Sequence, residues 1–131
     1  MISIVKVTMD EARKRGLKKV ALFGTRSTME GGFYQKTGEN YSVNVLTPDK
    51  NSREFINEKY FGELVAGIIK EETKRKLISI ADKMKEGEGI EGLILGGTEL
   101  PLILNQDDFK DIVLLNTAQI HVDAIIEGMF S

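Results

Sequence analysis

The stretch that most constrains the fold lies late in the sequence, where Leu93-Ile94-Leu95 is followed by Gly96-Gly97 and then by Thr98-Glu99. A short apolar run is typical of a buried strand, and two glycines let the backbone turn sharply at its end. An earlier stretch has the same build: Val20-Ala21-Leu22-Phe23 runs into Gly24-Thr25-Arg26-Ser27-Thr28. Because ligands of open α/β sheets bind outside the carboxyl ends of the strands, the two polar turns predict one shared pocket.

The order of the other elements predicts a doubly wound α/β fold. Apolar or β-branched runs indicate strands over residues 2–7, 19–24, 41–46, 92–95 and 112–115. Helical patterns fill the segments between them, over residues 8–15, 27–36, 53–85 with a break near 67–73, and from 116 or 117 onward. This alternation is typical of a parallel sheet with helices on both faces. We therefore expect a single domain over residues 1–131, built on a roughly four-stranded parallel sheet.

Capping signals set the expected helix boundaries. Thr8, followed three residues later by Glu11, has the spacing of a capping box, and Gly16 ends the same helix. Ser27 or Thr28 can cap the helix after the first polar turn. One of three polar residues begins the long helical segment: Asp49, Asn51 or Ser52.

Composition excludes several kinds of site. The 131 residues contain no cysteine and a single histidine, which excludes thiol nucleophiles, thiolate metal sites and multi-histidine metal sites. The acidic residues show no metal-ligand spacing, so we expect no metal. A formal net charge of -2 gives no electrostatic argument for a nucleic-acid partner. No apolar run approaches the roughly 20 residues of a membrane span, and the first residues lack a secretory pattern, so we expect a cytoplasmic protein.

The first polar turn supplies one set of candidate binding residues. Gly24, Thr25, Ser27 and Thr28 combine three hydroxyl groups with backbone N–H groups at a helix start, which suits a carboxylate or a phosphate. The turn lacks the lysine of a P-loop and the spacing of a dinucleotide fingerprint. A capped loop between a strand and a helix, with no ligand, would have the same sequence.

Glu99 and His121 are the candidate acid/base residues. Glu99 follows a strand end, where a carboxylate suits chemistry but also complements the dipole at a helix N-terminus. His121 lies six residues after Leu115, one or two turns into the last helix. A lone histidine at such a place is more often structural than functional.

With both turns considered, the sequence resembles the C-terminal half of the aspartate/glutamate racemases. The matching segments follow in the family's order, at residues 16–30, 33–34, 46–48, 63–70, 93–102, 116–117 and 120–121. They cover nearly all of the chain, and motifs in this order are specific. The resemblance implies one lobe of a two-lobed isomerase that uses no pyridoxal phosphate or other cofactor.

The resemblance also implies what chemistry this chain lacks. A cofactor-free racemase removes the α-proton from one face of an amino acid and returns a proton to the other, so it needs two acid/base groups. In the family these are usually two cysteines, one per lobe, with the substrate at the lobe interface. The family's second cysteine corresponds to Gly97 here, and the lobe that carries the first is expected to lie outside this chain.

Two functions follow from this resemblance. One is a truncated or degenerate lobe, inactive on its own, that binds a small carboxylate or an amino acid such as aspartate or glutamate. The residues implied for binding are those of the two turns: Gly24, Thr25, Ser27, Thr28, Gly97 and Thr98. The alternative is an active, divergent racemase, working as a homo- or hetero-oligomer, in which Glu99, His121 or a group from a partner chain replaces a thiol. A carboxylate could do so only if burial raised its pKa towards neutrality.

Half of a two-lobed protein should expose the apolar surface that contacts its other half. We therefore expect association, either as a homodimer or with a complementary N-terminal lobe.

Overall fold

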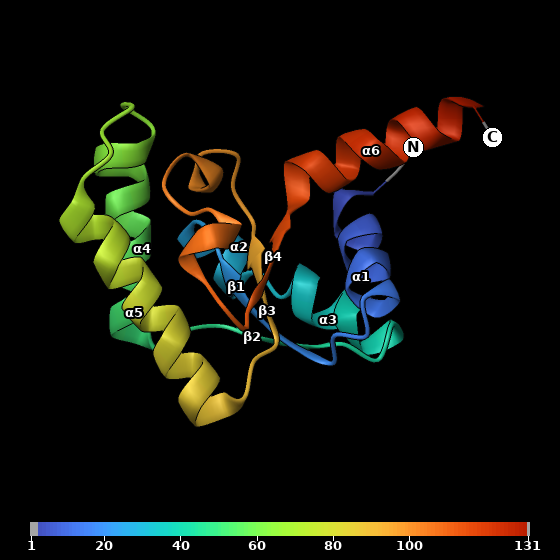
Figure 1. Ribbon diagram of the computed structural model, residues 1–131, viewed down its shortest axis with the longest axis horizontal. Helices are drawn as coiled ribbons and strands as arrows, with labels where there is room; N and C mark the ends of the chain where they lie inside the picture. Colours follow the sequence, from blue (N-terminus) through green and yellow to red (C-terminus); the bar gives the residue numbers. More distant parts are fainter. Residues whose placement is uncertain (1–2, 131) are drawn as a thin grey trace.

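A four-stranded parallel sheet forms the centre of the fold in the computed structural model (Figure 1). The structure describes residues 3–130, with side chains through residue 128. The strands β1 (Lys19–Phe23), β2 (Asn44–Leu46), β3 (Gly92–Leu95) and β4 (Val113–Asn116) lie in the order β2-β1-β3-β4. In register, Phe23 pairs with Leu95, and Leu95 pairs with Asn116. The turns that follow β1 and β3 therefore leave the sheet side by side.

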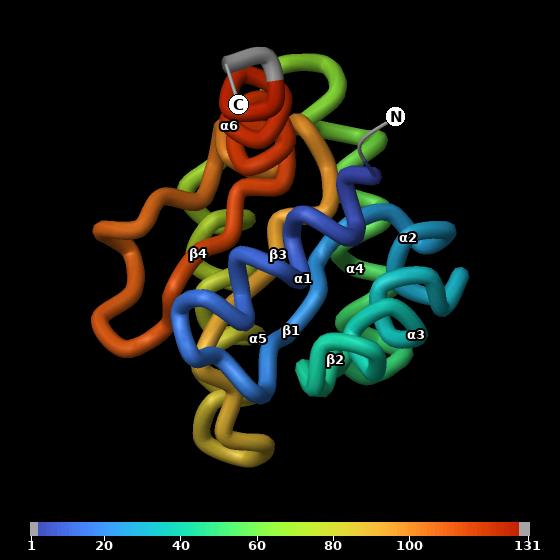
Figure 2. The backbone as a smooth tube through the Cα atoms, turned by 90° about the vertical axis from the view of Figure 1, so that its right-hand side faces the viewer, coloured from blue at the N-terminus to red at the C-terminus, as the bar shows by residue number. Residues whose placement is uncertain are grey.

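Helices cover both faces of the sheet, so the predicted doubly wound α/β class is confirmed. On one side lie α1 (Ile4–Lys14), α3 (Phe33–Asn40) and α6 (Thr117–Phe130), and on the other lie α4 (Lys50–Lys59) and α5 (Glu71–Glu88). The short α2 (Arg26–Glu30) follows β1. α6 packs on α1. Figure 2 shows α6 at the end of the sheet where β4 leads into it. Every residue of β3, and all of β1 after Lys19, is buried, as expected for strands covered on both faces.

The N-terminal segment is a helix, and the strand predicted over residues 2–7 is wrong for its described part. Ser3 caps α1, because its side chain accepts a hydrogen bond from the backbone N–H of Lys6 over 3.4 Å. Thr8 is not a cap: it is buried inside the helix, and its hydroxyl donates to the carbonyl oxygen of Ile4 over 2.7 Å. Residue 2 of the predicted strand lies outside the described residues. Packing of an apolar helix face outweighs the strand preference of β-branched side chains here.

The segment after β1 also differs from its predicted form. The cap of α2 is Thr25, whose hydroxyl accepts from the N–H of Thr28 over 3.4 Å, and not Ser27 or Thr28. The predicted helix over residues 27–36 is divided, because Gly32 has a φ of 82° and separates α2 from α3. Glycine takes this left-handed conformation without steric cost.

The long helical segment is interrupted where the sequence predicts. Asp49 is the cap of α4, and its side chain accepts from the N–H of Ser52 over 2.8 Å. A single π-turn, η1 (Tyr60–Leu64), follows α4, and the turn after it ends at Gly67, which has a φ of 77°. α5 then begins at Glu71, so the predicted break near residues 67–73 is confirmed.

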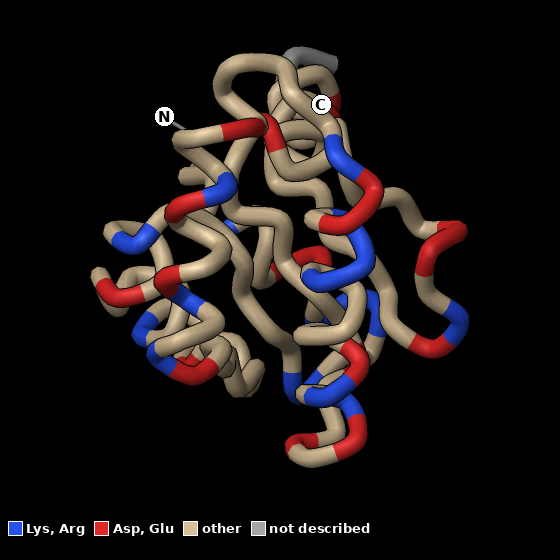
Figure 3. Tube along the Cα trace, turned by 90° about the vertical axis from the view of Figure 1, so that its left-hand side faces the viewer, with Lys and Arg blue, Asp and Glu red and all other residues tan. Residues whose placement is uncertain are grey.

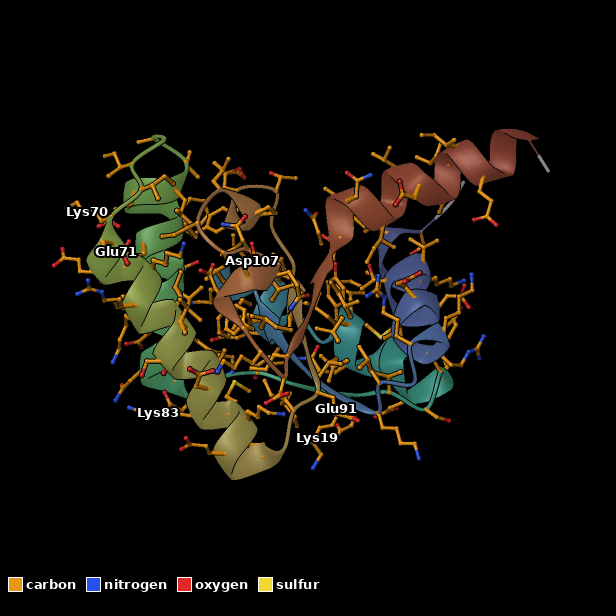
Figure 4. All side chains as sticks on the ribbon, viewed as in Figure 1. Lys19, Lys70, Glu71, Lys83, Glu91 and Asp107 are labelled. Atoms are coloured by element: carbon orange, nitrogen blue, oxygen red, sulfur yellow. The ribbon has the colours of Figure 1, made fainter. Side chains whose placement is uncertain are left out.

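A carboxylate joins β1 and β3 at the amino edge of the sheet. Oε1 of Glu91 accepts hydrogen bonds from the backbone N–H groups of Lys18, over 2.8 Å, and Lys19, over 3.1 Å. These bonds lower the pKa of Glu91. Figure 4 shows Lys19 and Glu91 at the end of the sheet opposite to α6. The two polar turns therefore lie at the other edge.

The surface carries both signs of charge. On the side formed by α4 and α5, acidic and basic residues are interspersed along the chain (Figure 3). Within residues 3–130, no helix combines the length and the apolar character needed to cross a membrane.

Candidate functional site

Gly96 and Gly97 lie at the carboxyl edge of the sheet between two side chains, those of Thr28 and Tyr60. The N–H of Gly96 donates to the carbonyl oxygen of Phe23 over 2.8 Å. A Cβ atom on Gly96 would lie 2.9 Å from that oxygen and 3.1 Å from Cγ2 of Thr28. A Cβ atom on Gly97 would contact the hydroxyl of Tyr60 and lie 2.5 Å from its Cε2 atom. Neither position can carry a side chain unless a neighbour moves.

The first polar turn packs against this double glycine through Thr28. A Cβ atom on the buried Gly24 would lie 3.1 Å from Cβ of Thr28, so the threonine fills the space between the two turns. The hydroxyl oxygens of Thr25 and Thr28 lie 3.2 Å apart and share a hydrogen bond. The two predicted turns are thus in direct contact.

Several polar groups of the first turn are already paired within the protein. The N–H of Arg26 donates to Oδ1 of Asn57 over 2.7 Å, and the N–H of Thr28 donates to Thr25. Ser27 is exposed at the same turn. The hydroxyl groups, rather than the whole set of backbone N–H groups predicted for binding, are therefore the main polar feature that this turn offers to a ligand.

An open cavity of about 380 Å³ adjoins the first turn. Its polar lining comes from Ser27 and Thr28, and its floor includes Gly96. The remaining lining is mostly apolar and comes from α1 and the start of α3: Ile4, Val5, Phe33 and Tyr34. Its size suits a small molecule, and its lining combines hydroxyl-bearing and apolar side chains.

Glu99 lies on the other side of the double glycine and accepts hydrogen bonds from two hydroxyl groups. The Thr98 hydroxyl donates to Oε1 over 2.6 Å and lies 3.0 Å from Oε2, and the Tyr60 hydroxyl donates to Oε1 over 2.7 Å. These hydrogen bonds, that of Thr98 first, lower the pKa of Glu99. Glu99 is therefore ionised at neutral pH, whereas an acid/base role would need its pKa raised.

Tyr60 is a site residue that the sequence analysis did not identify. Its side chain is 6% exposed, and burial, followed by the hydrogen bond to Glu99, raises its pKa above the ordinary value. Tyr60 and Glu99 are 39 positions apart in the sequence. The tyrosine stands inside a helical pattern, and only a glycine two residues later, at position 62, marks the segment as irregular.

His121 is separate from the cavity. It is half-buried in the second turn of α6, and the described lining of the cavity does not include it. Within residues 3–130, no cluster of three or more His, Cys, Asp or Glu side chains is arranged to hold a metal ion.

Large apolar side chains are exposed around the same edge of the sheet. They belong to η1 and the loop after it, to the short helix η2 (Leu100–Leu102) and to α6, which lie along the upper side of the molecule in Figure 1. The exposed residues on these elements are Phe61, Val65, Ile68, Ile69, Leu102, Val122, Ile125 and Ile126. Large exposed apolar patches are typical of protein–protein contact surfaces. We call these eight side chains the apolar rim.

Solved structures share this fold. The crystal structure of an aspartate racemase homologue from Pyrococcus horikoshii OT3 matches all of this chain at 39% identity with a TM-score of 0.94. A candidate Asp/Glu racemase from Yersinia pestis matches 98% of it at 33% identity with a TM-score of 0.90. The chain covers 57% of the first protein and 55% of the second, so it spans just over half of their length.

Sequence comparisons agree with the structural ones. An uncharacterized protein from the pnlA 3′ region of Pectobacterium carotovorum subsp. carotovorum is 30% identical over 107 residues, which are 82% of this chain and 69% of that protein. The sequence profile of the Asp/Glu/Hydantoin racemases matches residues 1–125. On this match the chain belongs to the Asp/Glu/Hydantoin racemase family.

Proposed function

We propose that this chain is an amino-acid-binding lobe of the racemase type, which binds aspartate or glutamate and does not interconvert their enantiomers on its own. The observation that supports the proposal is the glycine at position 97, which lies against Tyr60. The resemblance to the racemases assigns this position to the family's acid/base cysteine. The chain contains no cysteine at any position, so it supplies no thiol. Binding of this kind needs no pyridoxal phosphate.

The chemistry of racemisation supports the inactivity of the lobe alone. Proton transfer on both faces of the α-carbon needs two groups whose pKa values lie near the working pH. The lowered pKa of Glu99 makes this carboxylate a weak base and removes the proton that a general acid would donate. A divergent racemase that uses Glu99 in place of a thiol is therefore the weaker alternative.

Binding uses the two halves of the site for the two charged ends of an amino acid. Ser27 and Thr28 line the cavity, and the hydroxyl group of such a residue can donate to a carboxylate. The ionised Glu99, across the double glycine, can accept from the α-ammonium group.

The exposed apolar rim is consistent with a second lobe that would cover the site. The chain spans just over half of the two solved relatives, and the rim surrounds the edge at which the substrate would lie. We propose that a second copy of this chain covers this surface in the purified protein, in place of a complementary N-terminal lobe.

Two NMR measurements on the purified chain test the proposal. L-aspartate in heavy water should keep its α-proton signal in the presence of the protein, and loss of that signal would show racemase chemistry and overturn the inactive reading. Added L-aspartate should shift the amide signals of Ser27, Thr28 and Gly97. If no amide signal moves, the chain does not bind aspartate and the proposal is wrong.

A charge-removing variant locates the binding site. Glu99→Gln should weaken aspartate binding about tenfold or more, because it removes a charged hydrogen-bond acceptor for the ammonium group. Glu86→Gln is the matched control, since Glu86 is an exposed residue of α5. Equal binding by both variants would contradict the assignment of Glu99.

A further inference from the structure

The side chain of Tyr60 fills the space into which a side chain at position 97 would project. A Cβ atom built on Gly97 would contact the tyrosine hydroxyl and lie 2.5 Å from Cε2 and 2.7 Å from Cζ. These three are the nearest atoms to that position. The end of the tyrosine, with its hydroxyl group, therefore lies where the first atoms of a cysteine side chain would be.

Packing and hydrogen bonding hold the tyrosine in this position. Tyr60 is 6% exposed and packs edge-on against the ring of Phe61, with the ring centroids 5.5 Å apart. Its hydroxyl donates to Oε1 of Glu99 over 2.7 Å. A buried ring with its hydroxyl bound to an ionised carboxylate has little freedom to leave the site.

The backbone around Tyr60 is locally unusual. Tyr60 is the first residue of η1, and its carbonyl oxygen accepts from the N–H of Val65, five residues on, over 3.0 Å. Single π-turns are rare and are frequently found at functional sites. The π-turn is an observation independent of the contact with Gly97, and it also favours a functional role for Tyr60.

We propose that Tyr60 contacts the bound amino acid beside its α-carbon, with its hydroxyl taking the place of the residue-97 side chain and orienting Glu99 towards the α-ammonium group. This inference rests on the proposed function, since it concerns the same site. It assigns a binding role to a residue that the resemblance to the racemases does not point to. No proton transfer is part of it.

The three tyrosines of the chain provide the test. In protein labelled with ¹³Cζ-tyrosine, L-aspartate should shift the Tyr60 signal, which the variant Tyr60→Phe identifies by its loss. Tyr41 is the internal control, because it follows α3 and lies under the guanidinium group of Arg13, 4.7 Å from the ring centroid. The Tyr41 signal should stay unchanged.

Affinity measurements complete the test. Tyr60→Phe keeps the ring and removes only the hydroxyl, so it should fold as the natural protein does and bind L-aspartate about tenfold more weakly. Tyr41→Phe should bind with the natural affinity. The amide spectrum of each variant, recorded without ligand, shows whether its fold is retained.

The outcomes separate this inference from the proposed function. If aspartate shifts the amide signals of Ser27 and Thr28 but leaves the Tyr60 signal in place, and Tyr60→Phe binds as tightly as the natural chain, Tyr60 is a structural filler and the inference is wrong. The proposed function then stands. If aspartate moves no signal of the protein, the proposed function and this inference are both overturned.

Discussion

The hydroxyl of Thr117 donates a hydrogen bond of 2.8 Å to the carbonyl oxygen of Leu95. Thr117 is the first residue of α6 and is 3% exposed, and Leu95 is the last residue of β3. The bond joins the base of α6 to the point at which the chain leaves the sheet for Gly96 and Gly97. The position of the double glycine therefore depends on a side chain from a different element.

Thr117→Val should destabilise the protein by about 1–3 kcal/mol, because the isosteric methyl group leaves the buried Leu95 carbonyl without its partner. Urea unfolding measures the change in the free energy of unfolding. Thr117→Ser retains the hydroxyl group, so its free energy of unfolding should fall by less than that of Thr117→Val. Equal stability of the valine variant and the natural chain would show that the bond adds nothing.

Gly97→Ala should destabilise the chain by about 1–3 kcal/mol through overpacking, since its methyl group would contact the buried Tyr60. Gly87→Ala is the control: Gly87 lies in α5 with no atom within 4 Å of an added Cβ, so alanine there should stabilise by about 0.5–1 kcal/mol. Thermal unfolding of both variants gives the comparison. If Gly97→Ala is as stable as the natural chain, Tyr60 does not fill the space beside position 97 as described.

Glu63 should make stability depend on pH. Its buried carboxylate accepts from the Thr73 hydroxyl over 2.6 Å and pairs with Lys59 at 3.2 Å and Lys70 at 3.7 Å. These contacts, that of Thr73 first, lower its pKa. The stabilisation is therefore present above about pH 4.3, the ordinary glutamate value, and is lost as the pH falls through the lowered pKa.

Glu63→Gln should accordingly be less stable than the natural chain at pH 7, and the difference should shrink as the pH falls below 4. Unfolding curves across this range measure it. Glu71→Gln is the control, because Glu71 forms only an exposed ion pair with Arg75 and should change little. A difference that is constant with pH would contradict the role of the ionised carboxylate.

The apolar rim should make the purified chain dimeric. Sedimentation velocity at micromolar concentration should show a dimer, and the double variant Val65→Glu, Leu102→Glu should sediment as a monomer. These side chains are 56% and 58% exposed, so the substitutions leave the core unchanged. Lys83→Gln, on α5 away from the rim (Figure 4), should remain dimeric. A monomeric natural chain would show that a second copy does not cover the rim.

The central strands could be predicted from the sequence because each is an apolar run that ends at a glycine. The prediction for β3 matches its bounds, and that for β1 is one residue too long. The contact between the turn after β1 and the turn after β3 could also be predicted, because both turns follow the carboxyl ends of parallel strands. The N-terminal helix could not be read in this way, because Ile4, Val5 and Val7 favour a strand by local preference, whereas packing against the core selects a helix.

The candidate site could be predicted only where its residues follow strands. Thr28 and Glu99 stand next to strand ends, and their positions follow from the parallel sheet. The hydrogen-bond partner of Glu99 could not be predicted from the sequence. This partner, Tyr60, lies 39 residues earlier, at the start of the π-turn that follows α4. Pairings of that kind depend on tertiary packing, which local patterns do not contain.

The π-turn at Tyr60–Leu64 holds one more residue than an ordinary helical turn would. Deletion of Gly62 would remove this insertion and turn Tyr60 by about 100° around the helix axis relative to the residues that follow. The orientation of Tyr60 relative to Gly97 therefore depends on the single residue that lengthens this turn.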